Sequence, residues 1–217
     1  DDVTFQNLGL IVIDEQHRFG VHQRLALSEK GITPDLLVMT ATPIPRTLTL
    51  TTYGDMDVSQ LTEKPAGRRV IDTRTIGLGR MDEVIEGVAR KLKTGEKVYW
   101  VCPLVEESEL IDLAAATQRH AMMKLHFGEE NVALVHGQMK SAEREKEMEK
   151  FSRGNARLLI ATTVIEVGVD VPEATLMVIE HAERFGLAQL HQLRGRVGRN
   201  DKPSTCLLLF GDKLGET

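Results

Sequence analysis

Residues 81–102 read MDEVIEGVARKLKTGEKVYWVC, a segment in which a helical pattern passes into a strand pattern. From Met81 to Leu92 the apolar residues fall at positions 81, 84, 85, 88, 89 and 92, the spacing of a helix with one buried face. Gly95 follows as a C-terminal cap. Val98–Cys102 is apolar on both faces, which is typical of a strand inside a parallel sheet. The segment therefore predicts a helix that leads into a buried strand.

The same alternation extends to both sides of this segment. A second helical segment, Ser141–Phe151, carries interleaved charges and is closed by Gly154. Further apolar runs predict strands at Leu8–Ile13, Leu36–Met39, Val132–Val135, Arg157–Ala161, Leu176–Ile179 and Cys206–Phe210. Strands that alternate with helices predict an α/β fold, with a parallel sheet covered by helices on both faces.

The composition is that of an ordinary soluble globular chain. Of its 217 residues 41% are hydrophobic and 27% charged, which excludes a disordered or fibrous protein. No apolar run approaches the roughly 20 residues of a membrane-spanning helix. The first residues, DDVTFQ, lack the basic start and apolar stretch of a signal peptide, and they include no initiating Met. We expect the chain to be part of a longer protein.

Charge and cysteine content narrow the partners and the compartment. The net charge is −5, so any contact with DNA must be local. Aromatic residues make up only 4%, which argues against recognition by stacked bases. Cys102 and Cys206 lie far apart in apolar runs and fit neither a disulfide framework nor a metal spacing. They predict buried thiols in a reducing, cytoplasmic compartment.

A linker is predicted between Thr62 and Arg69, TEKPAGRR, where no apolar period survives. The residues before it carry too few strands for an independent core. The roughly 150 residues after it suffice for a complete domain. We expect part of a first domain at residues 1–64 and a second domain at residues 65–217.

Carboxylates follow the first predicted strand, Leu8–Ile13. Asp14 and Glu15 come directly after it, and Gln16 and His17 come next. A strand that ends in two carboxylates can present one to Mg²⁺ and the other to the water that attacks a nucleotide phosphate. The pattern is equally typical of a strand that runs into a charged surface turn.

A hydroxyl-rich turn ends the second predicted strand, because Thr40 and Thr42 follow Leu36–Met39. Hydroxyls beside a hydrolytic carboxylate can relay its state to neighbouring loops through hydrogen bonds. Alternatively, Thr42 and Pro43 only end a strand and begin a helix.

Arginines are concentrated in Gln189–Arg199, QLHQLRGRVGR. Planar guanidinium groups suit phosphate oxygens, and an arginine presented across a domain cleft stabilises the charge of a departing γ-phosphoryl group. These arginines could also pair with acidic neighbours or solvate a loop. Upstream, Ala161–Pro172 begins with hydroxyls and returns through Gly168 to Asp170, a turn that can contact a phosphate at one end and a ribose at the other.

These segments together resemble the motor core of superfamily 2 helicases. They correspond to the second motif (Asp14–His17), the third (Thr40–Thr42), the fifth (Ala161–Pro172) and the sixth (Gln192–Arg199). Longer strings at residues 14–20, 40–48 and 183–199 are similar to the bacterial RecG branch and to its relative, the transcription-repair coupling factor. Gln16 and the run PLVEESE at residues 103–109 favour the RecG branch.

The resemblance implies a monomeric, ATP- and Mg²⁺-dependent motor with a RecA-like fold that acts on branched DNA such as stalled forks and Holliday junctions, with no membrane partner. The implied catalytic residues are Glu15, which activates water, and the arginine fingers Arg196 and Arg199. The implied nucleotide contacts are Asp14, which also holds Mg²⁺, Gln16, His17, Gly168, Asp170 and Gln192. The implied coupling residues are Thr40 and Thr42, and the implied DNA contacts are Thr162, Thr163 and Lys140. His136, Gly137 and Arg144 resemble the segment that precedes the fifth motif in the family.

One departure from the family pattern limits what the chain can do by itself. No G-x-x-x-x-G-K-[S/T] loop occurs, and in the family this phosphate-binding loop lies upstream in motor domain 1. The resemblance therefore implies that residues 1–64 are the end of motor domain 1, that residues 65–217 are motor domain 2, and that the isolated chain does not hydrolyse ATP. Two alternatives stay open: a duplex-DNA translocase of the coupling-factor type and, for the chain alone, a non-catalytic module that binds nucleic acid or protein.

Overall fold

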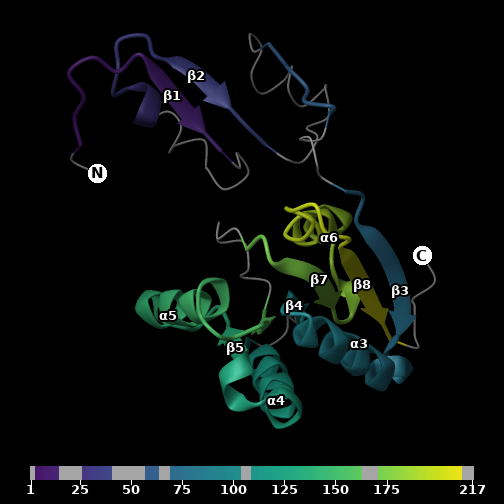
Figure 1. The fold of residues 1–217 in the computed structure, drawn as a ribbon. Helices are drawn as coiled ribbons and strands as arrows, with labels where there is room; N and C mark the ends of the chain where they lie inside the picture. The colour runs from purple at the N-terminus through teal and green to yellow at the C-terminus, as the bar shows by residue number, and fades with distance from the viewer. Residues whose placement is uncertain are drawn as a thin grey trace. The chain divides into compact units, whose positions relative to one another are not determined.

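The computed structural model describes residues 3–14, 26–40, 57–63, 69–103, 109–162 and 171–211 (Figure 1). The chain divides into two compact units, Asp1–Leu61 and Thr62–Thr217. The division falls at the beginning of the segment for which the sequence predicts a linker.

The first unit contains a parallel pair of strands, β1 (Leu10–Ile13) and β2 (Asp35–Val38). Side chains alternate along β1, with Ile11 and Ile13 buried and the residues between them exposed. The backbone N–H of Met39 donates to the carbonyl of Ile13 (2.8 Å), which extends the pairing by one residue. Both strands predicted in this part of the sequence are present.

The second unit is built on a six-stranded sheet in which every neighbouring pair is parallel, in the order β3-β8-β7-β4-β6-β5. The strands are β3 (Asp72–Gly77), β4 (Lys97–Val101), β5 (Val132–Val135), β6 (Leu158–Ala161), β7 (Ala174–Ile179) and β8 (Thr205–Phe210). The α-helices are α3 (Met81–Lys93), α4 (Glu109–Phe127), α5 (Ser141–Ser152) and α6 (Leu187–Arg194). Short 3-10 helices are η2 (Leu78–Arg80), η3 (Glu129–Asn131) and η4 (Ala182–Arg184). The predicted parallel α/β fold is confirmed.

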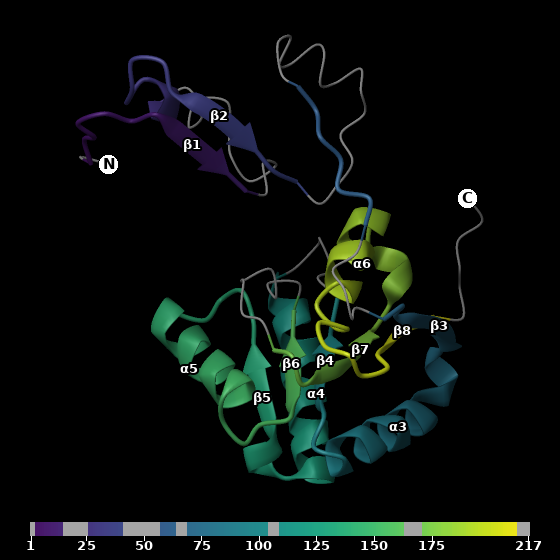
Figure 2. The ribbon, with the colours of Figure 1, turned by 45° about the horizontal axis from the view of Figure 1, so that its top comes forward.

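Helices cover both faces of this sheet (Figure 2). On one face α3 and α4 pack against the strands through a cluster centred on the fully buried Trp100. On the other face α5 and α6 contribute Phe151 and Leu193 to a second cluster, in which the rings of Tyr99 and Phe151 lie 5.0 Å apart. The three central strands β7, β4 and β6 are buried along their whole length.

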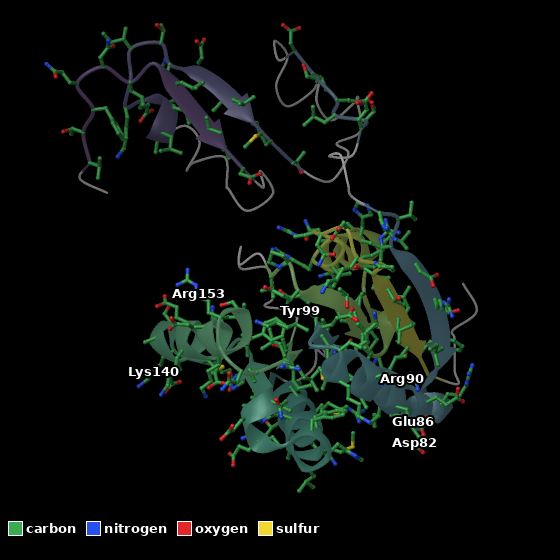
Figure 3. The ribbon with its side chains drawn as sticks, viewed as in Figure 1. Asp82, Glu86, Arg90, Tyr99, Lys140 and Arg153 are labelled. Atoms are coloured by element: carbon green, nitrogen blue, oxygen red, sulfur yellow. The ribbon has the colours of Figure 1, made fainter. Side chains whose placement is uncertain are left out.

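Charged side chains face solvent on the outer side of α3. Asp82, Glu86 and Arg90 follow one another at four-residue spacing along α3 and are exposed (Figure 3). Gly95, with φ at +81°, ends this helix as predicted. After α5, position 154 needs a glycine for a different reason. A Cβ there would lie 2.7 Å from the backbone oxygen of Lys150.

A buried ion pair joins α4 to the end of β7. Glu180 follows β7, and its carboxylate accepts hydrogen bonds from the guanidinium of Arg119 and from the indole N–H of Trp100. The guanidinium carbon of Arg119 lies 5.6 Å from the centre of the Trp100 ring. This arrangement, which no local sequence pattern marks, ties three elements together on one face of the sheet.

Both cysteines are buried free thiols, as predicted. Burial raises the pKa of Cys206 to about 12. Burial, together with the nearby charge of Glu180, also raises the pKa of Cys102. Both groups are therefore protonated at neutral pH and chemically inert. Among the helices that the structure describes, none has the length and apolarity needed to cross a membrane.

Candidate functional site

The first unit places Asp14 and Thr40 at one edge of its two-stranded sheet. Asp14 follows β1 directly and is exposed, and Thr40 follows β2 by two residues and is half-buried. Since the strands are parallel and paired up to Ile13 and Val38, both side chains lie beside the carboxyl ends of the strands. An exposed carboxylate in this place has the oxygen chemistry that Mg²⁺ takes together with phosphate oxygens. The predicted residues Glu15, Gln16, His17 and Thr42 lie outside the described residues.

In the second unit, α6 leads into the predicted arginine segment. The side-chain oxygen of Gln189 accepts the backbone N–H of Gly186 (3.1 Å) and so fixes the start of the helix. Gln192, one of the predicted nucleotide contacts, is half-buried on α6. The helix ends at Arg194, and the backbone N–H of the next residue, Gly195, donates to the carbonyl of His191 (3.0 Å). The residues after the helix, Gly195–Arg199, are called the arginine loop below.

The arginine loop is anchored by its middle and presents an arginine on either side. Val197 is fully buried in the core cluster beneath α6. Arg196 is half-buried, and its backbone N–H donates to the carbonyl of Leu193 (3.0 Å). Arg199 is exposed, and its Nε donates to the carbonyl of Gly195 (3.4 Å). The loop therefore has a fixed backbone from which charged side chains extend.

Two other segments of the second unit support this loop. Gly198 has φ at +71°, and a Cβ there would lie 2.9 Å from Cγ1 of Ile71. The side-chain amide of Asn200 donates to the carbonyl of Pro172, which precedes β7. Gly168 and Asp170, predicted to face the nucleotide, lie outside the described residues. Val171 and Pro172 are described, and the hydrogen bond from Asn200 holds Pro172 just beyond the arginine loop.

Among the described residues, buried polar atoms without hydrogen-bond partners gather at the carboxyl ends of β5 and β6. Thr162 follows β6, is 1% exposed, and donates its N–H to the carbonyl of Val135 (3.2 Å). Its hydroxyl is buried and has no hydrogen-bond partner among the described residues. The same holds for Nδ1 of His136, which follows β5. Burial, together with the positive charge of Arg144, lowers the pKa of His136 and so favours the neutral ring.

Arg144 on α5 adds a cation to this place. Its Nη2 donates to the carbonyls of Gly137 and Met139 (3.2 Å each), while its Nε is buried with no partner within the described part of the chain. Lys140 directly precedes α5 and is exposed (Figure 3). We call His136, Lys140, Arg144 and Thr162 the sheet-edge cluster. Thr163, predicted beside it, lies outside the described residues.

The sheet-edge cluster and the arginine loop lie at opposite edges of the sheet. Thr162 follows the carboxyl end of β6, whereas Pro172 and Ser204 precede the amino ends of β7 and β8. Because these strands run parallel in one sheet, Thr162 and Pro172 lie at opposite edges of it. Thr162 and the arginine loop are therefore separated by the height of the sheet.

Known proteins are similar to this chain in sequence. Residues 79–201 match the helicase conserved C-terminal domain family. The ATP-dependent DNA helicase RecG of Acidithiobacillus ferridurans is 54% identical over 214 residues, which make up 99% of this chain and 31% of that protein. The RecG of Escherichia coli strain K12 is 54% identical over 222 residues, 100% of this chain and 32% of that protein.

A solved structure agrees with these relatives. The structure of RecG bound to a three-way DNA junction has a TM-score of 0.78 and 44% sequence identity, and the match covers 99% of this chain and 27% of that one. The chain thus spans about a third of the length of the curated relatives that it matches. It belongs to the helicase conserved C-terminal domain family and is similar, along its whole length, to the RecG helicases.

Proposed function

We propose that this chain is part of the motor of an ATP-dependent DNA helicase that remodels branched DNA, such as stalled replication forks and Holliday junctions. Residues 1–64 would be the end of motor domain 1 and residues 65–217 motor domain 2. The observation that carries the proposal is the arginine loop, in which Arg196 and Arg199 flank a backbone that Gly198 and Val197 hold in place. The similarity to proteins named as ATP-dependent DNA helicases supports it.

In this proposal both carboxylates and arginines act on the nucleotide. Asp14 would hold Mg²⁺, and Glu15 would activate the attacking water. Arg196 and Arg199 meet the charge that develops on the γ-phosphoryl group, which is the role of an arginine finger. Bound Mg²⁺ would neutralise phosphate charge. Gln16, His17, Gly168, Asp170 and Gln192 would contact the nucleotide, and Thr40 and Thr42 would couple its state to neighbouring loops.

The sheet-edge cluster is the proposed DNA side of the second unit. Two of its donors, the hydroxyl of Thr162 and Nε of Arg144, have no hydrogen-bond partner among the described residues, and phosphate oxygens accept hydrogen bonds from such groups. Lys140 and Thr163 would add contacts to the same strand. The RecG structure with a three-way DNA junction supports branched DNA as the substrate class.

Replacement of Arg199 tests the nucleotide side. In a full-length protein that carries this chain, Arg199→Ala should lower the DNA-stimulated turnover of ATP by about a thousandfold or more, with nucleotide affinity little changed. Lys202→Ala is the matched control, because Lys202 is an exposed cation just beyond the same loop. Turnover by Arg199→Ala at the control rate would remove the finger role. Glu15→Gln should bind ATP and stall, and near-normal hydrolysis would refute its assignment as the base.

The two ends of α5 offer a matched test of the DNA side. Lys140 precedes the helix and Arg153 follows it, and both side chains are exposed (Figure 3). In Lys140→Ala, the slope of log affinity for branched DNA against log salt concentration should be smaller by about one, because about one charge contact with phosphate is lost. Arg153→Ala should keep the slope of the parent protein. Equal slopes for both variants would place the DNA elsewhere.

A further inference from the structure

We propose that Ile71 is a positioning residue that ties the connection between the two units to the arginine loop. The inference rests on the proposed function, because it assigns to Ile71 the task of holding Arg196 and Arg199 in their productive positions. Ile71 does not touch the nucleotide in this proposal. It acts through the backbone of Gly198.

The contact between Ile71 and Gly198 leaves no spare room. A Cβ on Gly198 would lie 2.9 Å from Cγ1 and 3.4 Å from Cδ1 of Ile71, and 3.7 Å from Cβ of Ser204. The backbone of Gly198 is therefore seated directly on the Ile71 side chain. With φ at +71°, this position also strains any residue other than glycine. Shape and backbone conformation both fix the loop at this point.

Neighbouring interactions prevent Ile71 from shifting without the loop. Its side chain is half-buried and packs against the core cluster that includes Val197 and Leu193. The next residue, Asp72, donates its N–H to the carbonyl of Ser204 (3.0 Å), where the pairing of β3 with β8 begins. Ile71 is thus held beside the residues that follow the arginine loop as well as those within it.

The position of Ile71 in the sequence gives this contact a function. The first unit ends at Leu61, and Ile71 lies just before the first strand of the second unit. The connection between the units therefore enters the sheet at the arginine loop. A displacement of the connection acts on Ile71 first and through it on Gly198. Since phosphoryl transfer depends on placement to within a fraction of an ångström, such a displacement changes the catalytic rate.

The test measures ATP turnover in a full-length protein that carries this chain, with DNA present. Ile71→Ala should lower kcat at least tenfold while the KM for ATP stays within about twofold, because the arginines act on the transition state. Ile76→Ala is the matched control: Ile76 is at the other end of β3, is also half-buried, and packs against the cluster on the opposite face. Ile76→Ala should lose about as much thermal stability as Ile71→Ala and should keep the kcat of the parent protein.

A double variant distinguishes positioning from general loosening. Gly198→Ala should lower kcat through its contact with Ile71, and Ile71→Ala in the same chain should relieve that clash. The double variant should therefore lose less kcat than the fold-losses of the two single variants multiplied together. An effect equal to that product would overturn the proposal. If Ile71→Ala does not fold, Ile71→Val decides: a kcat equal to that of Ile76→Val overturns the role.

The outcomes also separate this inference from the proposed function. If Arg199→Ala retains turnover, the finger role itself fails. If Arg199→Ala is inactive and Ile71→Ala matches Ile76→Ala in kcat, only the positioning role of Ile71 fails. A selective loss of kcat in Ile71→Ala, with the control intact, supports both.

Discussion

The ion pair between Arg119 and Glu180 allows a stability prediction with a definite size. Nε and Nη2 of Arg119 lie 2.6 Å and 2.9 Å from the two carboxylate oxygens of Glu180, which is 6% exposed. Arg119→Met keeps most of the apolar stem and removes the guanidinium. The carboxylate then keeps the indole of Trp100 and, at 3.9 Å, the thiol of Cys102. A buried charge is left without its counter-charge.

The expected loss follows from the burial of the two partners. Breaking a buried pair from one side costs about 3–5 kcal/mol. The Arg119 side chain is 20% exposed, so water can reach the vacated space, and we expect a loss of about 2–3 kcal/mol in the free energy of unfolding. With a urea m-value of about 2 kcal/mol/M, the unfolding midpoint should fall by about 1–1.5 M.

The chain carries its own probe for this measurement. Trp100 is the single tryptophan and is fully buried in the second unit, so its fluorescence follows the unfolding of that unit in urea. Arg74→Met is the matched control, because Arg74 pairs with Asp72 at 2.7 Å while its side chain is 68% exposed, and it should leave the midpoint unchanged. The double variant Arg119→Met with Glu180→Gln should recover part of the loss. A shift in Arg119→Met no larger than in Arg74→Met would refute the reasoning.

Three further predictions concern the stability of the second unit, each measured by the same urea transition. Lys97, 9% exposed, donates to the last carbonyls of α5 (2.6 and 2.9 Å), so Lys97→Met should cost about 1–3 kcal/mol. Gly154→Ala should cost about 1–3 kcal/mol because its Cβ meets a backbone oxygen at 2.7 Å, whereas Gly87→Ala inside α3, with ordinary contacts, should stabilise by about 0.5–1 kcal/mol. Burial, with nearby cations, lowers the pKa of His120 and His136 in the folded state, so the unfolded state binds protons more readily. Stability should therefore fall as the pH drops through the ordinary histidine value near 6.5, and His→Gln at both positions should flatten that dependence.

Strands inside the sheet were predictable because burial on both faces demands continuous apolar sequence. Val132–Val135 was located with its true ends, and β4, β6 and β7 within one or two residues. The edge strand β3 reads DTRTIG and is mostly exposed, so no apolar run marks it. It is recognisable only through its pairing with β8, which lies far along the chain.

Helices were predictable where an apolar stripe was narrow. In α3 the buried residues Val84, Val88 and Leu92 recur every four positions. In α4, ELIDLAAATQRHAMMKLHF, apolar residues are spread around the helix and no stripe stands out. Its tertiary contacts, including the pair between Arg119 and Glu180, fix it in place instead.

Residues of the candidate site also differ in whether the local sequence marks them. Arg196 and Arg199 could be recognised from the local sequence, because glycines and arginines alternate within a few residues. Ile71 and Arg119 could not, since each acts on a residue that only the fold brings near: Gly198 for the first and Glu180 for the second. A single isoleucine after a linker carries no local signal of a role.

The two edges of the sheet suggest how the proposed motor would link DNA to ATP. The strands β7, β4 and β6 between the sheet-edge cluster and the arginine loop are fully buried, and a close-packed interior of this kind does not deform gradually. Strands of this length put the edges about 15–20 Å apart. A pull on DNA at the carboxyl edge would therefore move the second unit as one body, and the arginine loop would move with it. Ile71 and Gly198 both belong to this unit, so their contact would keep the arginine loop in place while the unit moves.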